Sequence, residues 1–599
     1  MRGGLAALCA SHGIEPFYVG IDGRERAVPE RTLATLAGLF GLDAPAPAPP
    51  AGIAEALAER GAPRCHVTHG LGRRRAWGVT CQLPGLASAR NLGMGDFADL
   101  AALCRLAGAE GADFVGVNPL NALFWSAPDR VSPFFPSNRR FLNPLHLAPE
   151  WIAGFKGLTP QESVQAARLR STALIDVPAL AGLTVAVLRR LFAGFPWTAA
   201  RRAAFRAFCA EGGAALEAHA LFEAISEVMV AGGNGGGHGA GWTGWPAPLR
   251  DRGSAGSRAF AAEHRARVDW HLWLQWQADA QLARVQRAAR AAGMRIGLYL
   301  DMAVGAAPDG SAAWAAPEIT VPGVSIGAPP DDFSTSGQDW GLAPLSPVGL
   351  AGADARPFAE TIAAVMRHAG ALRIDHAMSL ARLWLIPRGA PATEGAYVRY
   401  PLSLLLARLA EASRAARCAV IGEDLGVVPE GFRALMARRR IHAYKVFFFE
   451  ADKAGMGFLR RWPRDALACV ATHDMPTLAG WWEGADLALR RDLGMLSAAE
   501  WGARSTARAA ERRALVRRFG TRMAATVSPK LHAAVAGNRC RLMALQIEDA
   551  LGVIEQVNVP GTVDEHPNWR RRLPVTLERL GEHPGWRAHV AALRRARPR

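Results

Sequence analysis

Acidic side chains, with histidine and arginine beside them, stand at the ends of four apolar segments of this 599-residue sequence. They are Asp301, then Arg373, Asp375 and His376, then Glu423 and Asp424, and finally His473 and Asp474. A solvated segment end explains any one of these groups, but four in succession predict one shared site. The chain has no C-x-x-C metal spacing and no G-x-x-x-x-G-K-[ST] phosphate loop. Several carboxylates without either feature point to glycosidic bond chemistry.

Glycosidic bond chemistry gives two carboxyl groups different tasks. One must stay ionised to attack the anomeric carbon, and a neighbouring arginine favours that ionised form. The other must carry a proton for the leaving oxygen, so burial has to raise its pKa. The 18 tryptophans, against five tyrosines, fit stacking on sugar faces. We expect most of them in the core, and Trp340, Trp481 and Trp482 as the binders because they lie in polar stretches.

The pattern of apolar residues predicts the elements that must position these side chains. Strands are expected at 77–83, 113–120, 294–304, 371–376, 418–424, 443–450 and 465–474. Helices are expected at 97–111, 268–293, 357–370, 401–417 and 429–440. Near-continuous apolar strands that alternate with helices indicate a parallel sheet covered by helices, in an α/β barrel or a doubly wound sheet. In a barrel, the carboxyl ends of the strands form the rim where active sites are built.

The Pro/Ala-rich stretch 44–52 is the best candidate for a domain boundary. We therefore predict a small N-terminal extension domain over 1–70, with short helices around a strand or turn in its first 43 residues. Residues 71–599 are predicted to form the catalytic unit, with its main insertion at about 119–290. The Gly-rich stretch 232–245 inside that insertion predicts a flexible loop rather than a nucleotide site.

The net charge of +17 makes nucleic acid or an anionic membrane the first partner to consider. Only four of the 70 basic residues are lysines, however, and the arginines are dispersed among abundant alanine, glycine and proline. A GC-rich coding sequence produces this mixture whatever the function, so we expect neither partner. No run of 18 apolar residues and no convincing secretory signal is present. The eight widely spaced cysteines indicate reduced thiols and a cytoplasmic protein.

The segments LRIDH (372–376), IGEDLG (421–426) and ATHD (471–474) resemble three conserved regions of the α-amylase superfamily barrel. Longer segments narrow the resemblance to the 4-α-glucanotransferases of glycoside hydrolase family 77, also called amylomaltases or disproportionating enzymes. These segments follow the family's order and lie at 77–100, 132–144, 327–341, 422–430, 472–484 and 558–573. The chain resembles the bacterial maltodextrin-system form, which carries an N-terminal extension, and residues 1–70 resemble part of one.

The resemblance implies a (β/α)8 TIM barrel with large helical insertions. It implies an enzyme that moves α-1,4-glucan segments from a donor maltodextrin to the 4-hydroxyl of an acceptor glucan or glucose, by retaining double displacement. Asp375 is then the nucleophile, Glu423 the general acid/base and Asp474 the transition-state stabiliser. Retention predicts carboxyl groups of Asp375 and Glu423 about 5–5.5 Å apart. The trio is shared with α-glucan hydrolases of the α-amylase type, which are the alternative.

The resemblance also implies a set of substrate-binding residues and no cofactor or metal. Arg373 is expected to position Asp375, and His376 and His473 to bind hydroxyls of the sugar in the −1 subsite. The other expected binders are Asp309, Gln338, Trp340 and Phe134. Three positions depart from the family pattern: Phe134 replaces a tyrosine, Met475 an asparagine and Asp332 a tyrosine. These departures concern substrate preference rather than the reaction.

Overall fold

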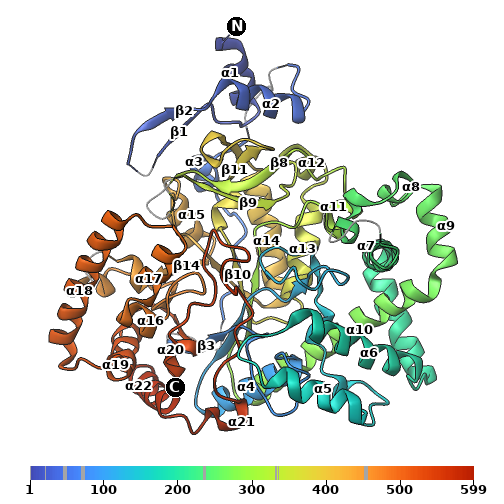
Figure 1. The fold of residues 1–599 in the computed structure, drawn as a ribbon. Coiled ribbons are helices and arrows are strands. Elements are labelled where there is room, and N and C mark those ends of the chain that lie inside the picture. Colours follow the sequence, from blue (N-terminus) through green and yellow to red (C-terminus); the bar gives the residue numbers. More distant parts are fainter. Residues whose placement is uncertain are drawn as a thin grey trace.

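The computed structural model describes residues 2–20, 22–44, 50–68, 74–233, 238–330, 334, 336–450 and 456–598. Within these ranges, eight parallel strands close into a barrel in the order β10-β13-β14-β15-β16-β3-β4-β7 (Figure 1). The strands are β3 (Ala76–Cys81), β4 (Phe114–Val117), β7 (Gly297–Met302), β10 (Ala371–Ile374), β13 (Ala419–Gly422), β14 (Ile441–Val446), β15 (Ala466–Cys469) and β16 (Leu542–Gln546). The predicted barrel fold is confirmed, and the doubly wound sheet is excluded by the closure of the ring.

Seven observed strands coincide with the predicted ones, but each ends before its predicted end because the backbone turns at the rim; β3 and β14 begin one and two residues before their predicted starts. The strand predicted at 371–376 ends at Ile374, and His376 adopts a left-handed conformation with φ of 46°. The strand predicted at 443–450 ends at Val446 and passes into a 3-10 turn. The eighth strand, β16, was not among the predicted elements, although its five residues are all buried.

The barrel interior is filled with side chains rather than open. Phe114, Tyr299 and Tyr444 belong to the buried cluster inside the ring. A Cβ at Gly78 would lie 2.4 Å from the Phe114 ring, and one at Gly116 would lie 2.6 Å from the Tyr299 ring. Glycine at these two positions therefore makes room for the aromatic rings beneath the site.

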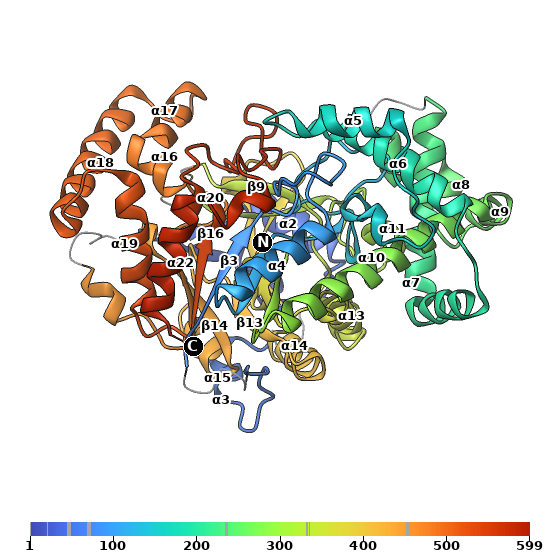
Figure 2. The same ribbon diagram turned by 90° about the horizontal axis from the view of Figure 1, so that it is seen from below.

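Helices surround the barrel and extend into two lobes on opposite sides, which Figure 2 shows from below. The covering helices include α4 (Phe97–Ala109), α10 (Arg265–Ala291), α13 (Arg356–Met366), α14 (Leu402–Ala416), α15 (Phe432–Arg438), α19 (Ala524–Ala536) and α22 (Pro584–Ala596). One lobe lies between β4 and β7 and contains α5 (Pro160–Arg170), α6 (Val177–Ala193), α7 (Ala199–Ala231), α8 (Ala247–Arg250) and α9 (Ala255–Glu263). The other lobe contains α16 (Leu478–Glu483), α17 (Ala485–Asp492) and α18 (Ala498–Phe519).

A four-stranded antiparallel sheet stands over the barrel rim, and the N-terminal residues lie on top of it (Figure 1). Its order is β12 (Ala396–Arg399), β11 (Arg382–Pro387), β8 (Val324–Ala328) and β9 (Gln338–Leu342). The N-terminal elements are α1 (Arg2–Ser11), β1 (Phe17–Val19), β2 (Glu25–Ala27) and α2 (Glu30–Leu39), the helices around strands that the sequence predicts for this part. Parts of the predicted linker 44–52 and of the Gly-rich loop 232–245 lie outside the described residues.

Two further sequence predictions concern the environment of the chain. All eight cysteines fall in the described ranges and are free thiols, as predicted. None of the helices in those ranges has both the length and the apolar character needed to span a membrane.

Candidate active site

Arg373 lies at the centre of the rim, on β10, paired in register with Asp301 of β7. Its Nη1 donates to both carboxylate oxygens of Asp301, each at 2.9 Å. Its Nη2 lies 2.8 Å from Oδ1 of Asp375. Arg373 and Asp301 are both buried, so this arrangement fixes the guanidinium plane and turns one of its edges toward Asp375. Asp375 thus faces a fixed positive charge and a fixed hydrogen-bond donor at the rim.

Glu423 follows β13 directly and is buried under the site. Its Oε2 accepts a hydrogen bond from the backbone N–H of His376 at 2.8 Å, and its Oε1 accepts one from Leu425 at 2.6 Å. Burial raises the pKa of Glu423 to about 7, Arg373 opposes that rise, and the charge of Asp375 adds to it. Glu423 can therefore hold a proton near neutral pH, which is the property of a general acid.

Asp474 lies in the loop after β15, with a side chain that is 44% exposed. Its Oδ2 is 3.2 Å from Nε2 of His473, and its Oδ1 accepts a hydrogen bond from Asn558 Nδ2 at 2.6 Å. The protein atoms crowded around this concave part of the rim raise the pKa of Asp474, but His473 and Asn558 outweigh them and leave it below its usual value. Asp474 is therefore a carboxylate at neutral pH.

His473 is enclosed by two aromatic rings and one amide. Phe134 stacks on the imidazole with a centroid separation of 4.7 Å and an interplanar angle of 24°. The Trp569 ring lies 5.4 Å from it, and Asn118 Nδ2 lies 3.0 Å from its Nδ1. Burial lowers the pKa of His473, but Asp474 more than compensates, so the pKa lies above its usual value. The predicted binders Phe134 and His473 thus form one unit beside Asp474.

His376 and the strand β9 form the other side of the site. The Trp340 ring meets the His376 ring edge to face at 5.2 Å, and Trp340 Nε1 donates to Gln338 Oε1 at 3.2 Å. Burial lowers the pKa of His376 to about 4 against the opposing charge of Asp375, so its imidazole is neutral. The structure therefore brings Gln338, Trp340 and His376 together, although they come from separate parts of the chain.

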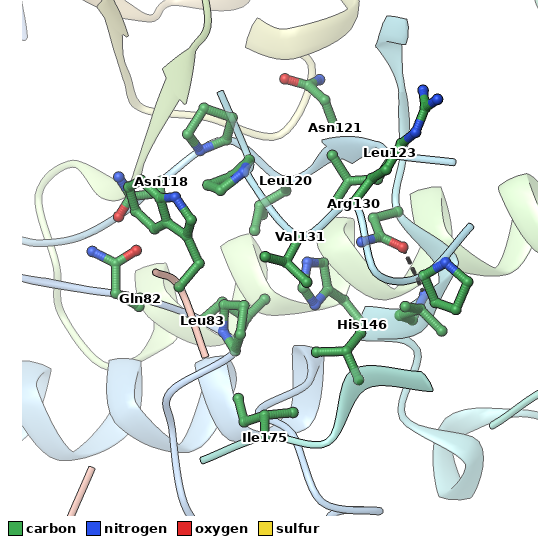
Figure 3. A pocket seen from close by; sticks show the side chains of 18 of the residues that line it. Gln82, Leu83, Asn118, Leu120, Asn121, Leu123, Arg130, Val131, His146 and Ile175 are labelled. Atoms are coloured by element: carbon green, nitrogen blue, oxygen red, sulfur yellow. Dashed lines mark hydrogen bonds between the residues drawn. The ribbon is translucent and has the colours of Figure 1, made fainter. Parts of the chain in front are cut away.

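Asp309 stands apart from this group. Its Oδ2 accepts from Arg130 Nη1 at 2.9 Å, and its carbonyl accepts from the backbone N–H of Trp242 at 3.2 Å. Arg130 in turn lines an apolar pocket. Gln82 and Asn118 line this pocket too, and they also line the chamber inside the barrel rim. Figure 3 shows Asn118 and Gln82 at one end of this pocket and Arg130 at the other. Asp309 does not itself line this pocket and is connected to it only through Arg130.

Two expectations from the sequence change in the structure. Trp481 and Trp482 were expected to bind sugar but are 3% and 2% exposed in helix α16, where Trp481 stacks on Phe448 at 5.5 Å. The prediction was wrong because both rings face the core from this helix, and the polar neighbours Thr477 and Asp486 are buried with them. Asp424 also leaves the site: its Oδ1 accepts from the backbone N–H of Tyr444 at 2.8 Å, and Oδ2 accepts from Arg433. Asp332 lies outside the described residues.

The structure adds residues that the sequence did not assign. Asp301 stood at a predicted strand end but received no role, and Asn558 and Trp569 lie in the segment 558–573 that carries part of the family resemblance. The chamber inside the rim is also lined by Gln546 of the unpredicted strand β16 and by Glu548 of the helix α20 (Ile547–Leu551) that follows it. Burial raises the pKa of Glu548 to about 7. Among the described residues, no group of three or more His, Cys, Asp or Glu side chains is placed to hold a metal ion.

A (β/α)8 barrel with such carboxylates at its rim fits the class of enzymes that act on glycosidic bonds. The family model of the 4-alpha-glucanotransferases, glycoside hydrolase family 77, matches residues 81–577, and the chain belongs to this family. A 4-alpha-glucanotransferase of Mycobacterium tuberculosis is 38% identical over 535 residues, which cover 84% of this chain and 72% of that protein. One of Haemophilus influenzae is 33% identical over 531 residues, covering 84% and 76%.

Solved structures agree with this assignment. The amylomaltase from Corynebacterium glutamicum superposes with a TM-score of 0.83 at 25% identity, over 99% of this chain and 100% of that one. The amylomaltase from Streptococcus agalactiae in complex with acarbose has the same fold, with a TM-score of 0.71 at 19% identity over 87% and 98% of the two chains. The family that the sequence segments indicated is therefore confirmed.

Proposed function

We propose that this chain is a 4-alpha-glucanotransferase, which moves an α-1,4-glucan segment from a donor maltodextrin to the 4-hydroxyl of an acceptor glucan or glucose. Family membership supports the reaction, and the carboxylate trio supports the mechanism. The observation that carries it is the contrast between the two inner carboxyl groups: Asp375 faces Arg373 at 2.8 Å, whereas burial raises the pKa of Glu423 to about 7. The first has a guanidinium opposite it, as a nucleophile needs, whereas the second can keep a proton near neutral pH.

In the first half of the reaction, an Asp375 oxygen attacks C1 of the sugar in the −1 subsite. Glu423 gives its proton to the glycosidic oxygen as the C1–O bond breaks, and the reducing-end fragment leaves with that proton. Asp474 and His473 bind the hydroxyls of the −1 sugar, where the ionised Asp474 stabilises the positive charge that develops on the ring. The product is a covalent β-glycosyl enzyme on Asp375.

In the second half, Glu423 is a carboxylate and removes the proton from the 4-hydroxyl of the acceptor. The acceptor oxygen displaces Asp375 from C1, which restores an α-1,4 bond and regenerates both carboxyl groups. Two inversions give net retention, for which the Asp375 and Glu423 carboxyl groups must lie about 5–5.5 Å apart. That separation stays a prediction.

Transfer requires that a sugar hydroxyl outcompete water at the glycosyl enzyme. We assign Trp340 and Gln338 to the acceptor, because Trp340 lies against His376 at the rim and Gln338 is hydrogen-bonded to Trp340. A hydrolase of the α-amylase type would use the same trio, but family membership favours the transferase.

Incubation with maltotriose alone distinguishes the two reactions. A transferase releases glucose and builds longer chains while the number of reducing ends stays constant. A rise in reducing ends in proportion to maltotriose consumed would instead establish hydrolysis, and no reaction with any maltodextrin would contradict both.

Three further assignments accompany this function. We place the protein in the cytoplasm, which the eight free cysteines support. We assign residues 1–70 to an extension domain and 71–599 to the catalytic unit, with the insertion at about 119–290. A neutral glucan is neither steered nor selected by the net charge of +17, so we assign no nucleic acid or membrane partner.

A further inference from the structure

The first residues of the chain extend the sheet that carries the acceptor residues. The backbone N–H of Glu15 donates to the carbonyl of Tyr397 at 2.8 Å, and the N–H of Arg399 donates to the carbonyl of Gly13 at 2.9 Å. Ile14 forms an antiparallel bridge with Val398. Residues 13–15 therefore act as an outer strand beside β12, in the sheet whose other edge is β9 with Gln338 and Trp340.

Glu15 places its carboxylate between two arginines of this sheet. Its Oε2 accepts from Arg382 Nη1 at 2.6 Å, and its Oε1 accepts from Arg399 Nε at 3.1 Å. The side chains of Glu15 and Arg382 are only 17% and 18% exposed. Arg382 also lies over the Tyr397 ring, at 3.7 Å from the centroid. Water therefore replaces these partners poorly, and loss of Glu15 leaves Arg382 without its carboxylate.

Arg382 is connected to the active site by a very short stretch of chain. It begins β11, and only the 3-10 turn Ala377–Leu380 and Ala381 separate it from His376. The carbonyl of Ala381 is itself held by the backbone N–H of Tyr400 at 2.9 Å. Burial lowers the pKa of His376, the charge of Asp375 opposes this effect, and the charge of Arg382 adds to the lowering.

A second connection runs through the sheet to Trp340. Tyr18, from the N-terminal strand β1, packs edge to face on Trp384 of β11 at 4.7 Å. Trp384 is paired with Gly327 of β8, and Gly327 is paired with Asp339 of β9. Asp339 lies between the two expected acceptor residues. The N-terminal segment thus contacts β11 at two points, Arg382 and Trp384, and each point starts a connection to the acceptor side of the rim.

We propose that Glu15 is a positioning residue for the acceptor: its carboxylate holds Arg382, and through it the turn of His376 and the sheet that presents Trp340. The N-terminal extension then contributes to the choice between a sugar hydroxyl and water at the glycosyl enzyme. This proposal rests on the proposed transferase function. It assigns no contact between Glu15 and substrate.

The test measures how the glycosyl enzyme partitions. The purified full-length protein receives maltosyl fluoride as donor and glucose at increasing concentration, and the transfer product and free maltose are quantified. The measured quantity is the glucose concentration at which the two products are equal. This glucose concentration is independent of the fraction of active enzyme, so a general loss of folded protein leaves it unchanged. For Glu15→Gln we expect the glucose concentration that gives equal products to rise about tenfold, as loss of a charged hydrogen bond predicts.

Two further variants sharpen the test. Arg31→Gln removes another ion pair of the same extension, with Glu394 in the loop between β11 and β12, but the Arg31 side chain is 73% exposed and lies away from Arg382. The glucose concentration at which this variant forms the two products equally should match that of the wild type within about twofold, as expected for an exposed pair. The double variant Glu15→Gln/Arg382→Gln should need no higher glucose concentration for equal products than Arg382→Gln alone, because both changes break the same interaction.

The proposal is overturned if Glu15→Gln partitions like the wild type, if Arg31→Gln shifts the partition equally, or if the effects of Glu15→Gln and Arg382→Gln are additive. Should Glu15→Gln not fold, Glu15→Asp is measured by the same criterion, since its shorter side chain cannot reach both arginines. A wild-type protein that forms no transfer product at any glucose concentration contradicts the transferase function itself, and is thereby distinguished from a failure of this proposal.

Discussion

Arg373 binds both carboxylate oxygens of Asp301 with a single guanidinium nitrogen, at 2.9 Å each. The two residues are paired in register on neighbouring strands, so the contact is set by the barrel itself and not by a mobile loop. Asp301 thereby fixes the orientation in which the other terminal nitrogen of Arg373 faces Asp375.

The first prediction concerns Asp301→Asn. The amide keeps the size of the side chain but removes the charge opposite a buried arginine, and its nitrogen cannot accept from Arg373. Breaking a buried pair costs about 3 kcal/mol or more, so we expect kcat/KM for maltotriose to fall on the order of 100-fold. Steady-state kinetics of the folded variant measures this effect.

Asp113→Asn is the matched control for Asp301→Asn. Asp113 is also buried and pairs with one arginine, Arg295, at 2.6 and 2.7 Å, but it precedes β4 at the opposite end of the barrel. We expect this variant to lose thermal stability and keep its kcat. Equal loss of kcat in the two variants would show that Asp301 supports the fold rather than the site.

The second prediction concerns pH. Glu423 must be protonated in the free enzyme to act as an acid, and burial raises its pKa to about 7. The protonated form dominates below that value, so kcat/KM should fall about tenfold for each pH unit above it. A pH profile with maltotriose measures this limb. Glu423→Gln should abolish it, together with most of the activity, and a decline that begins only near pH 9 would contradict the role of Glu423.

The barrel was predictable because seven of its strands are nearly continuous apolar runs between helices with clear periodicity. The strand β16 was missed, since five residues followed directly by a helix have no pattern of their own. The placement of the three carboxylates at the rim was predictable because Asp375 and Glu423 directly follow apolar strands and Asp474 ends the apolar run 465–474. Partners such as Asn558 and Trp569 were not, because they come from an irregular segment far along the chain whose approach to the rim depends on tertiary packing.

The third prediction concerns Phe134, which stacks on His473 where the family pattern has a tyrosine. Phe134→Ala removes this stack, which frees the imidazole that binds the −1 sugar. An aromatic pair contributes about 0.5–1.5 kcal/mol beyond its burial, so we expect the donor KM to rise up to about tenfold. Phe134→Tyr keeps the ring and should stay close to the wild type. A Phe134→Ala variant with unchanged KM would remove Phe134 from the binding residues.

The tryptophans show where composition alone misleads. Trp340 and Trp481 both stand in polar stretches, but Trp481 faces the core from helix α16, whereas Trp340 lies on an edge strand beside His376. Polar neighbours in sequence lie on the opposite face of a helix as readily as around a binding site. Only the element that carries each ring separates the two cases.

The last prediction concerns Trp340→Ala. The ring meets His376 edge to face at 5.2 Å and covers the side of the site assigned to the acceptor. Its loss removes the surface against which an acceptor sugar packs and admits water, while Asp375, Glu423 and Arg373 keep their contacts. We expect hydrolysis of maltosyl fluoride within about threefold of the wild type, but a transfer-to-hydrolysis ratio at fixed glucose that falls about tenfold, the effect of one lost stacking contact. Trp482→Phe, a change at a buried tryptophan outside the site, should leave that ratio unchanged. If Trp340→Ala lowers both reactions in parallel, Trp340 supports the formation of the glycosyl enzyme, and the assignment of β9 to the acceptor is wrong.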